Sequence, residues 1–116
     1  MSEERLERMR SLADAILDKK GEDLVALDVR EVSSFTDGFL LASGTSDRHV
    51  RTLADAVVER AREMGDRPLG IEGYDEGRWV LIDLGDLVVH LFQCEVREHY
   101  DLERLWSDAA RVAVGE

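Results

Sequence analysis

The sequence has a single cysteine and no long apolar run, and each scarcity excludes a class of protein. Cys94 has no second cysteine to pair with, which fits a reducing compartment. No apolar run approaches the roughly 20 residues that a membrane-spanning helix needs. The first residues, MSEERLERMRSL, are charged and lack the apolar centre of a signal peptide. We therefore expect a cytoplasmic protein of a bacterium, with no membrane partner.

Basic residues are also scarce relative to acidic ones. The chain has 15 Lys and Arg against 26 Asp and Glu, which gives a net charge of -11. A field of this sign repels a phosphate backbone, so direct readout of nucleic acid is not expected. The same charge attracts a basic protein partner, although it also has the simpler role of keeping a protein in solution.

The residues that are present are typical of one globular domain over residues 1–116, with 44% apolar and 35% charged residues. Helical periodicity predicts a helix over residues 2–20, ended by Gly21 in a left-handed conformation. A second helix is predicted after Ser46, which is a good N-cap, and ends at Gly65.

Alternating apolar residues predict five strands between and after these helices. A short turn or helical turn over residues 95–100 and a last helix that is capped by Asp101 and includes Ala109 complete the order. Together they predict an α/β fold, a mixed β-sheet packed by helices. The predicted strands cover residues 23–30, 39–43, 69–72, 78–84 and 87–93.

Two of these strands are joined by Gly85-Asp86, a two-residue hairpin signal that sets their register. Directly opposed residues share a face, so one face is wholly aliphatic and must be the core. The other face places Trp79 opposite Phe92, Leu81 opposite His90, and Asp83 opposite Val88. The aliphatic face consists of Val80, Ile82, Leu84, Leu87, Val89 and Leu91.

The second face mixes aromatic rings with an acid and a histidine, which is typical of a binding surface. An alternative remains that the last helix folds back and buries Trp79 and Phe92, leaving Asp83 and His90 at the rim. Acidic residues are frequent around this face: between residues 72 and 104 there are nine acids and three arginines. A basic protein partner would suit them.

Three kinds of chemistry are weaker interpretations of the same region. His90, Cys94 and His99 match no structural zinc spacing, and Cys94 has no evident base to activate it. Asp83 and Asp86 could hold Mg²⁺ if SGTSD, residues 43–47, bound a phosphate at its helix start. Ordinary helix capping explains SGTSD better, so no catalytic residue, metal or cofactor is expected.

The hairpin and the segment after it resemble the ribosomal silencing factor family, also called Iojap-like. The family pattern is W-x-L-x-D-x-G-D-x-V-V-H-x-F followed by R-x-x-Y-x-L-E-x-L-W. The upstream segment TDGFLLASGTSDRHV, residues 36–50, is similar to the family's TDYFVIASGTSDRHV, with Gly38 in place of tyrosine. The pattern is met by Trp79, Leu81, Asp83, Gly85, Asp86, Val88, Val89, His90, Phe92, Arg97, Tyr100, Leu102, Glu103, Leu105 and Trp106.

This resemblance implies a nucleotidyltransferase-like fold without catalytic residues, and a homodimer in isolation. It also implies binding to the large ribosomal subunit through its basic ribosomal protein fourteen. That binding would block the small subunit from joining and repress translation. The alternatives are a nucleotide-binding enzyme of nucleotidyltransferase type, and an acidic adaptor for another basic protein.

We assign partner-binding roles on this basis. Apolar contact is expected from Trp79, Phe92 and Tyr100. Ion pairs with the partner are expected from Asp83, Asp86 and Glu103. His90 is expected to form a hydrogen bond, and Arg97 to brace a neighbouring carboxylate or the chain that leads to the last helix.

Overall fold

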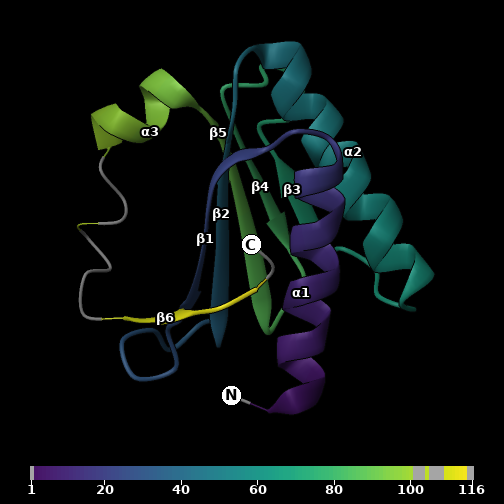
Figure 1. Cartoon of the computed structure of the whole chain (residues 1–116), viewed down its shortest axis with the longest axis vertical. Coiled ribbons are helices and arrows are strands. Elements are labelled where there is room, and N and C mark those ends of the chain that lie inside the picture. Colours follow the sequence, from purple (N-terminus) through teal and green to yellow (C-terminus); the bar gives the residue numbers. More distant parts are fainter. Residues whose placement is uncertain (1, 101–103, 105–108, 115–116) are drawn as a thin grey trace.

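The computed structural model of the protein describes residues 2–100, 104 and 109–114, and the side chains of these residues except 99 and 100. Its elements form a six-stranded sheet in the order β3-β4-β5-β2-β1-β6, covered by helices (Figure 1). Pairing is antiparallel except between β2 and β5, which are parallel, so the prediction of a mixed α/β fold is confirmed. The elements are α1 (Glu3–Asp18), β1 (Glu22–Asp28), β2 (Gly38–Gly44), α2 (Asp47–Glu63), β3 (Gly70–Glu72), β4 (Trp79–Asp83), β5 (Leu87–Gln93), α3 (Cys94–Tyr100) and β6 (Ala110–Val112).

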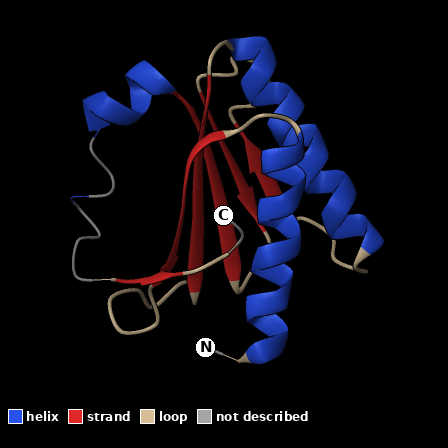
Figure 2. Ribbon diagram, viewed as in Figure 1, coloured by secondary structure: helices blue, strands red, loops and turns tan. Residues whose placement is uncertain are grey.

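Helices α1 and α2 lie side by side on one face of the sheet, whereas α3 lies apart from them, beyond the end of β5 (Figure 2). The main core fills the space between the two long helices and the sheet. The aliphatic face predicted for the β4–β5 hairpin points into this core, and each of its six residues is at most 9% exposed. The burial of these side chains fixes which way the other hairpin face points, since a one-residue slip would reverse both faces.

Helix α1 ends differently from the prediction. Lys20, and not Gly21, takes the left-handed conformation, with φ 65°. Gly21 is still required, because a Cβ at this position would collide with the side chain of Ile16. The glycine therefore permits close approach between the chain and α1, while the lysine accepts the unfavourable backbone angle.

Helix α2 begins and ends as predicted. The Ser46 side chain caps it by accepting a hydrogen bond from the His49 backbone N–H at 3.0 Å. Gly65 follows its last turn with φ 83°, an angle that glycine adopts without strain. The capped start of α2 is thus fixed directly after β2.

The C-terminal part departs from the prediction in two ways. Residues 95–100, predicted as a turn or a helical turn, belong to helix α3, so the helical alternative is confirmed. Ala109, predicted within a last helix, lies outside any helix. Directly after it, β6 pairs antiparallel with β1, a strand that the sequence reading missed. Within the predicted last helix, Arg104 is described and is helical, whereas residues 101–103, including Glu103, and residues 105–108 lie outside the described residues. The alternation of Val112 and Val114 is the one signal that could have indicated β6.

Across the described part of the chain, no helix combines the length and the apolar character that crossing a membrane requires.

Candidate functional site

The β4–β5 hairpin has the register that the turn predicted. Trp79 pairs with Phe92, Leu81 with His90, and Asp83 with Val88. Gly85 adopts φ 90° in the turn, and its backbone N–H donates to Asp83 Oδ1 at 2.8 Å. The carboxylate of Asp83 therefore stabilises the turn while remaining partly exposed.

Four rings form a cluster on the face of the sheet away from α1 and α2. The rings of Phe39 and His90 meet edge to face with their centroids 5.0 Å apart, and the ring centroids of Trp79 and Phe92 are 5.1 Å apart. His90 also stacks on Phe92 at 5.9 Å. Phe39 comes from β2, which pairs with β5 in parallel. Because this pairing is between distant segments, the sequence reading did not include Phe39.

His90 holds the indole of Trp79 in place. Trp79 Nε1–H donates to His90 Nδ1 at 3.1 Å, so Nδ1 must be unprotonated and the neutral ring carries its proton on Nε2. Burial lowers the pKa of His90 to about 4. The predicted hydrogen-bonding role of His90 is therefore directed inward, to Trp79, and the ring is uncharged near neutral pH.

The rings differ sharply in exposure. Phe92 is fully buried, in an apolar cluster with Leu27, Val29 and Val96 among its members. Phe92 therefore cannot make the direct partner contact predicted for it. Its ring instead packs against the inner side of the Trp79 indole. The partly exposed residues Trp79, Leu81, Asp83 and Val88 are hereafter called the hairpin face.

Arg97 braces the interior of the protein. Its side chain is only 7% exposed, and Nη1 donates to the hydroxyl of Ser43 on β2 at 2.9 Å. The Cys94 thiol similarly donates to the carbonyl of Gly44 at 3.5 Å. These contacts, together with the buried Val96, hold α3 against the end of β2. A surface contact by Arg97 does not fit this burial.

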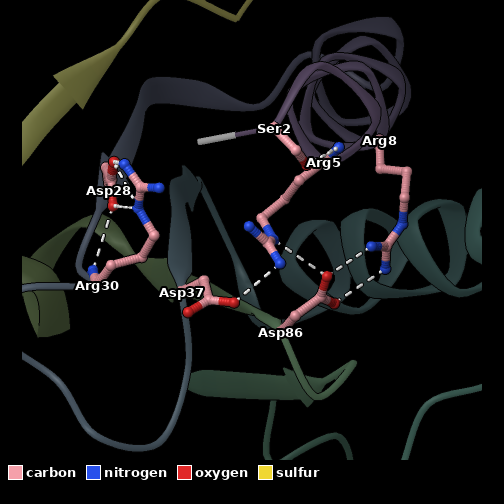
Figure 3. A network of polar contacts seen from close by, with 7 residues as sticks. All are labelled: Ser2, Arg5, Arg8, Asp28, Arg30, Asp37 and Asp86. Atoms are coloured by element: carbon pink, nitrogen blue, oxygen red, sulfur yellow. Dashed lines mark hydrogen bonds and ion pairs between the residues drawn. The ribbon is translucent and has the colours of Figure 1, made fainter.

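Asp86 is held by α1 and does not match its predicted role in pairing with a partner. Arg8 binds both carboxylate oxygens of Asp86, at 2.7 and 3.1 Å, and Arg5 donates to it at 3.2 Å (Figure 3). Arg5 also pairs with Asp37, and Arg8 with Asp66. The hydrogen bond from Arg8 is the main cause that keeps the pKa of Asp86 below its usual range. The acid thus ties the hairpin turn to α1.

Backbone N–H groups of Thr45 in the SGTSD turn and of Arg48 just after it are engaged within the protein. Thr45 N–H donates to His49 Nδ1 at 2.9 Å, and Arg48 N–H donates to Asp47 Oδ1 at 2.9 Å. His49 Nε2 is then left to donate to the Lys19 carbonyl at 2.8 Å, which links α2 to the end of α1. This arrangement supports the capping interpretation, since a phosphate would compete with internal acceptors for these donors.

Cys94 is poorly suited to act as a nucleophile. Burial, as the largest cause, raises the pKa of its thiol, so the reactive thiolate is disfavoured. Among the described residues, no three His, Cys, Asp or Glu side chains are grouped closely enough to hold a metal. The side chains of His99 and Tyr100 and all of Glu103 lie outside the described residues.

Comparison with known proteins gives consistent matches over most of the chain. A family model described as "Ribosomal silencing factor during starvation" matches residues 2–116. The protein named "Ribosomal silencing factor RsfS" in Bacillus subtilis is 45% identical over 101 residues, covering 87% of this chain and 86% of that protein. The protein of the same name in Halalkalibacterium halodurans is 42% identical over 106 residues, covering 91% of each. A solved structure from Chromobacterium violaceum matches with a TM-score of 0.84 and 36% identity, covering 92% of this chain and 88% of that one.

Proposed function

Because the chain belongs to the ribosomal silencing factor family, we propose that it represses translation by binding the large ribosomal subunit. It binds there through the basic ribosomal protein fourteen and sterically blocks the small subunit from joining. The names of the Bacillus subtilis and Halalkalibacterium halodurans relatives support silencing of the ribosome in general. The particular contact is argued from the hairpin face.

The observation that carries the proposal is the fixed, partly exposed indole of Trp79. Its N–H is anchored on His90, and its ring packs on the buried Phe92. Tryptophan is among the residues that most often dominate binding energy, and a ring already held in place loses little conformational entropy on binding. Leu81 and Val88 extend the partly exposed apolar area beside it.

Charge supports a basic partner at this face. Asp83 is partly exposed at the turn end of β4, and the chain as a whole carries a net charge of -11. Acidic surroundings speed the encounter with a basic protein and fix its orientation more than they add affinity. We further propose that Tyr100 and Glu103 contribute to the same contact, as the sequence pattern implies.

Co-sedimentation with ribosomal subunits tests this function. Purified protein is mixed with large subunits, small subunits are then added, and the mixture is separated on a sucrose gradient. Binding to large subunits together with loss of joined ribosomes is the expected result. Asp83→Lys should weaken both effects without unfolding the protein, because it places a cation opposite basic residues.

The matched control is Asp14→Lys, which makes the same charge change at an exposed position of α1. It should leave binding and subunit joining unchanged within error. Protein that remains at the top of the gradient, apart from the large subunits, would overturn the proposal. If protein binds large subunits and joining is nevertheless normal, the blocking step is wrong.

We also infer that the free protein is a homodimer, which size-exclusion chromatography with light scattering measures directly. A mass near twice 13.1 kDa is expected. A monomeric mass at all concentrations used would contradict this inference and leave ribosome binding untouched.

A further inference from the structure

A groove lies on the helix side of the sheet, beside its β3 edge, and therefore away from the hairpin face. Its walls are the outer side of α2 and the chain from Ile71 to Glu76. Tyr74 joins the two walls by donating a hydrogen bond from its hydroxyl to Asp55 Oδ1 at 2.8 Å. Ile71, 43% exposed, and the partly buried Val58 provide apolar area in this groove.

The neighbouring strand β3 is an open edge of the described sheet. It pairs with β4 on one side and has no strand on the other. An edge strand directs alternate backbone N–H and C=O groups outward, where an extended peptide can add to the sheet. Leu69, just before β3, is 75% exposed and extends the apolar area along this edge. The groove and the edge meet at Ile71.

The groove is strongly acidic. Asp55, Glu59, Asp75 and Glu76 line it, against a single cation, Arg62. In a strand added at the edge, every second side chain would lie on the α2 side, above these carboxylates. A second copy of this chain, with its net charge of -11, is the wrong partner for an acidic groove.

We propose that the β3 edge and the α2 groove bind an extended segment of another protein that carries Lys or Arg at alternate positions. Backbone pairing to β3 supplies part of the affinity. The carboxylates select basic side chains, and Ile71 and Leu69 contact the apolar stems. This surface acts independently of the hairpin face and of the proposed ribosome contact.

Fluorescence anisotropy with the full chain tests the proposal. The probe is the labelled peptide Thr-Lys-Val-Arg-Val-Lys-Thr, compared with Lys-Arg-Lys-Thr-Val-Val-Thr, which has the same composition without alternation. The alternating peptide should bind at least about tenfold more tightly, and its affinity should fall as salt rises. Equal affinity for the two peptides would overturn the proposal.

Backbone pairing has its own signature. A strand that adds to an edge uses the N–H groups of alternate residues only. N-methylation of one alternate set in the probe should therefore abolish binding, while N-methylation of the other set should be tolerated. If both methylated peptides bind like the parent, attraction is purely electrostatic and the strand-addition proposal is wrong.

Protein variants locate the site. Glu59→Lys combined with Glu76→Lys reverses two exposed charges of the groove and should weaken probe binding at least about tenfold. Glu7→Lys combined with Asp14→Lys makes the same charge change on exposed positions of α1 and should have little effect. If both double variants lose the same amount of probe affinity, the probe is attracted by the overall negative charge and not by the groove, and the proposed site is wrong. Self-association would also overturn the proposal. If the molecular mass of the protein rises at high concentration, and only the Glu59→Lys and Glu76→Lys variant prevents this rise, a second copy of the chain covers the β3 edge.

Discussion

The contact between Trp79 and His90 is the residue-scale feature on which the hairpin face depends. The hydrogen bond of 3.1 Å requires a neutral imidazole, and burial keeps it neutral by lowering its pKa to about 4. His90→Phe keeps an aromatic ring in the cluster but removes the acceptor. A lost neutral hydrogen bond costs about 1 kcal/mol, so binding to large subunits should weaken about fivefold.

Tryptophan fluorescence of the folded His90→Phe variant checks whether the indole of Trp79 is released, since both its environment and its mobility should change. Trp79 would then bind from a less fixed position. Unaltered affinity in a folded His90→Phe protein would show that orientation of the indole does not matter.

His90 also makes stability depend on pH. Its pKa is lowered in the folded protein relative to the ordinary value of 6.5, so the unfolded chain takes up a proton first as pH falls. Its contribution is fully present above pH 6.5 and is lost between pH 6.5 and about 4, by up to about 1.4 kcal/mol per pH unit. Urea unfolding at several pH values measures this, and His90→Phe should flatten the dependence in that window. An unchanged slope in the variant would assign the effect to other groups.

At the scale of elements, the hairpin turn is attached to α1 by Asp86. Its partners Arg5 and Arg8 and the acid itself are each less than a third exposed, so screening by solvent is incomplete. Asp86→Asn should lower the free energy of unfolding by about 1–2 kcal/mol and leave ribosome binding intact in the folded protein. Thermal melting measures this, with the exposed Asp14→Asn as a control that stays within about 0.5 kcal/mol. Normal stability with weakened binding would restore the predicted role of Asp86 as a partner contact.

Elements also show why part of the site could be predicted and part could not. The hairpin register follows from a local turn and strict alternation, so the placement of Trp79, Asp83 and His90 on one face was predictable. Phe39 reaches the same cluster through parallel pairing of β2 with β5, which no local pattern specifies. The pairing of Asp86 with Arg5 and Arg8 spans about 80 positions of sequence, and an acid in a turn gives no indication of its partner.

The burial of the aromatic side chains on the hairpin was not predicted correctly from the sequence pattern. Aromatic residues opposite an aliphatic face indicated a binding surface, yet Phe92 and His90 lie under it and only Trp79 is partly exposed. A second apolar cluster, containing Val96 from α3, covers Phe92. Covering of this kind depends on where a short helix packs at the end of the sheet, and alternation along one strand does not predict that position.

At the scale of the whole molecule, the sheet separates two surfaces. Helices α1 and α2 cover one face (Figure 1). On that side α2 and the chain from Ile71 to Glu76 form the acidic groove, while the hairpin face lies on the opposite side of the sheet. The overall charge of -11 should make binding to large subunits weaken with rising salt. Affinity that is constant between low and high salt would leave the apolar contact at Trp79 as the only attraction.

The most direct test of the hairpin face is the dissociation constant of Trp79→Ala for purified large subunits, beside wild type and Tyr74→Ala. Both variants remove a partly exposed aromatic ring, but Tyr74 lies at the α2 groove. Loss of a dominant contact residue costs about 2 kcal/mol or more, so Trp79→Ala should bind about 30-fold more weakly while Tyr74→Ala binds like wild type. Equal affinities for folded Trp79→Ala and wild type would contradict the account, because the ribosome would then be recognised by another surface.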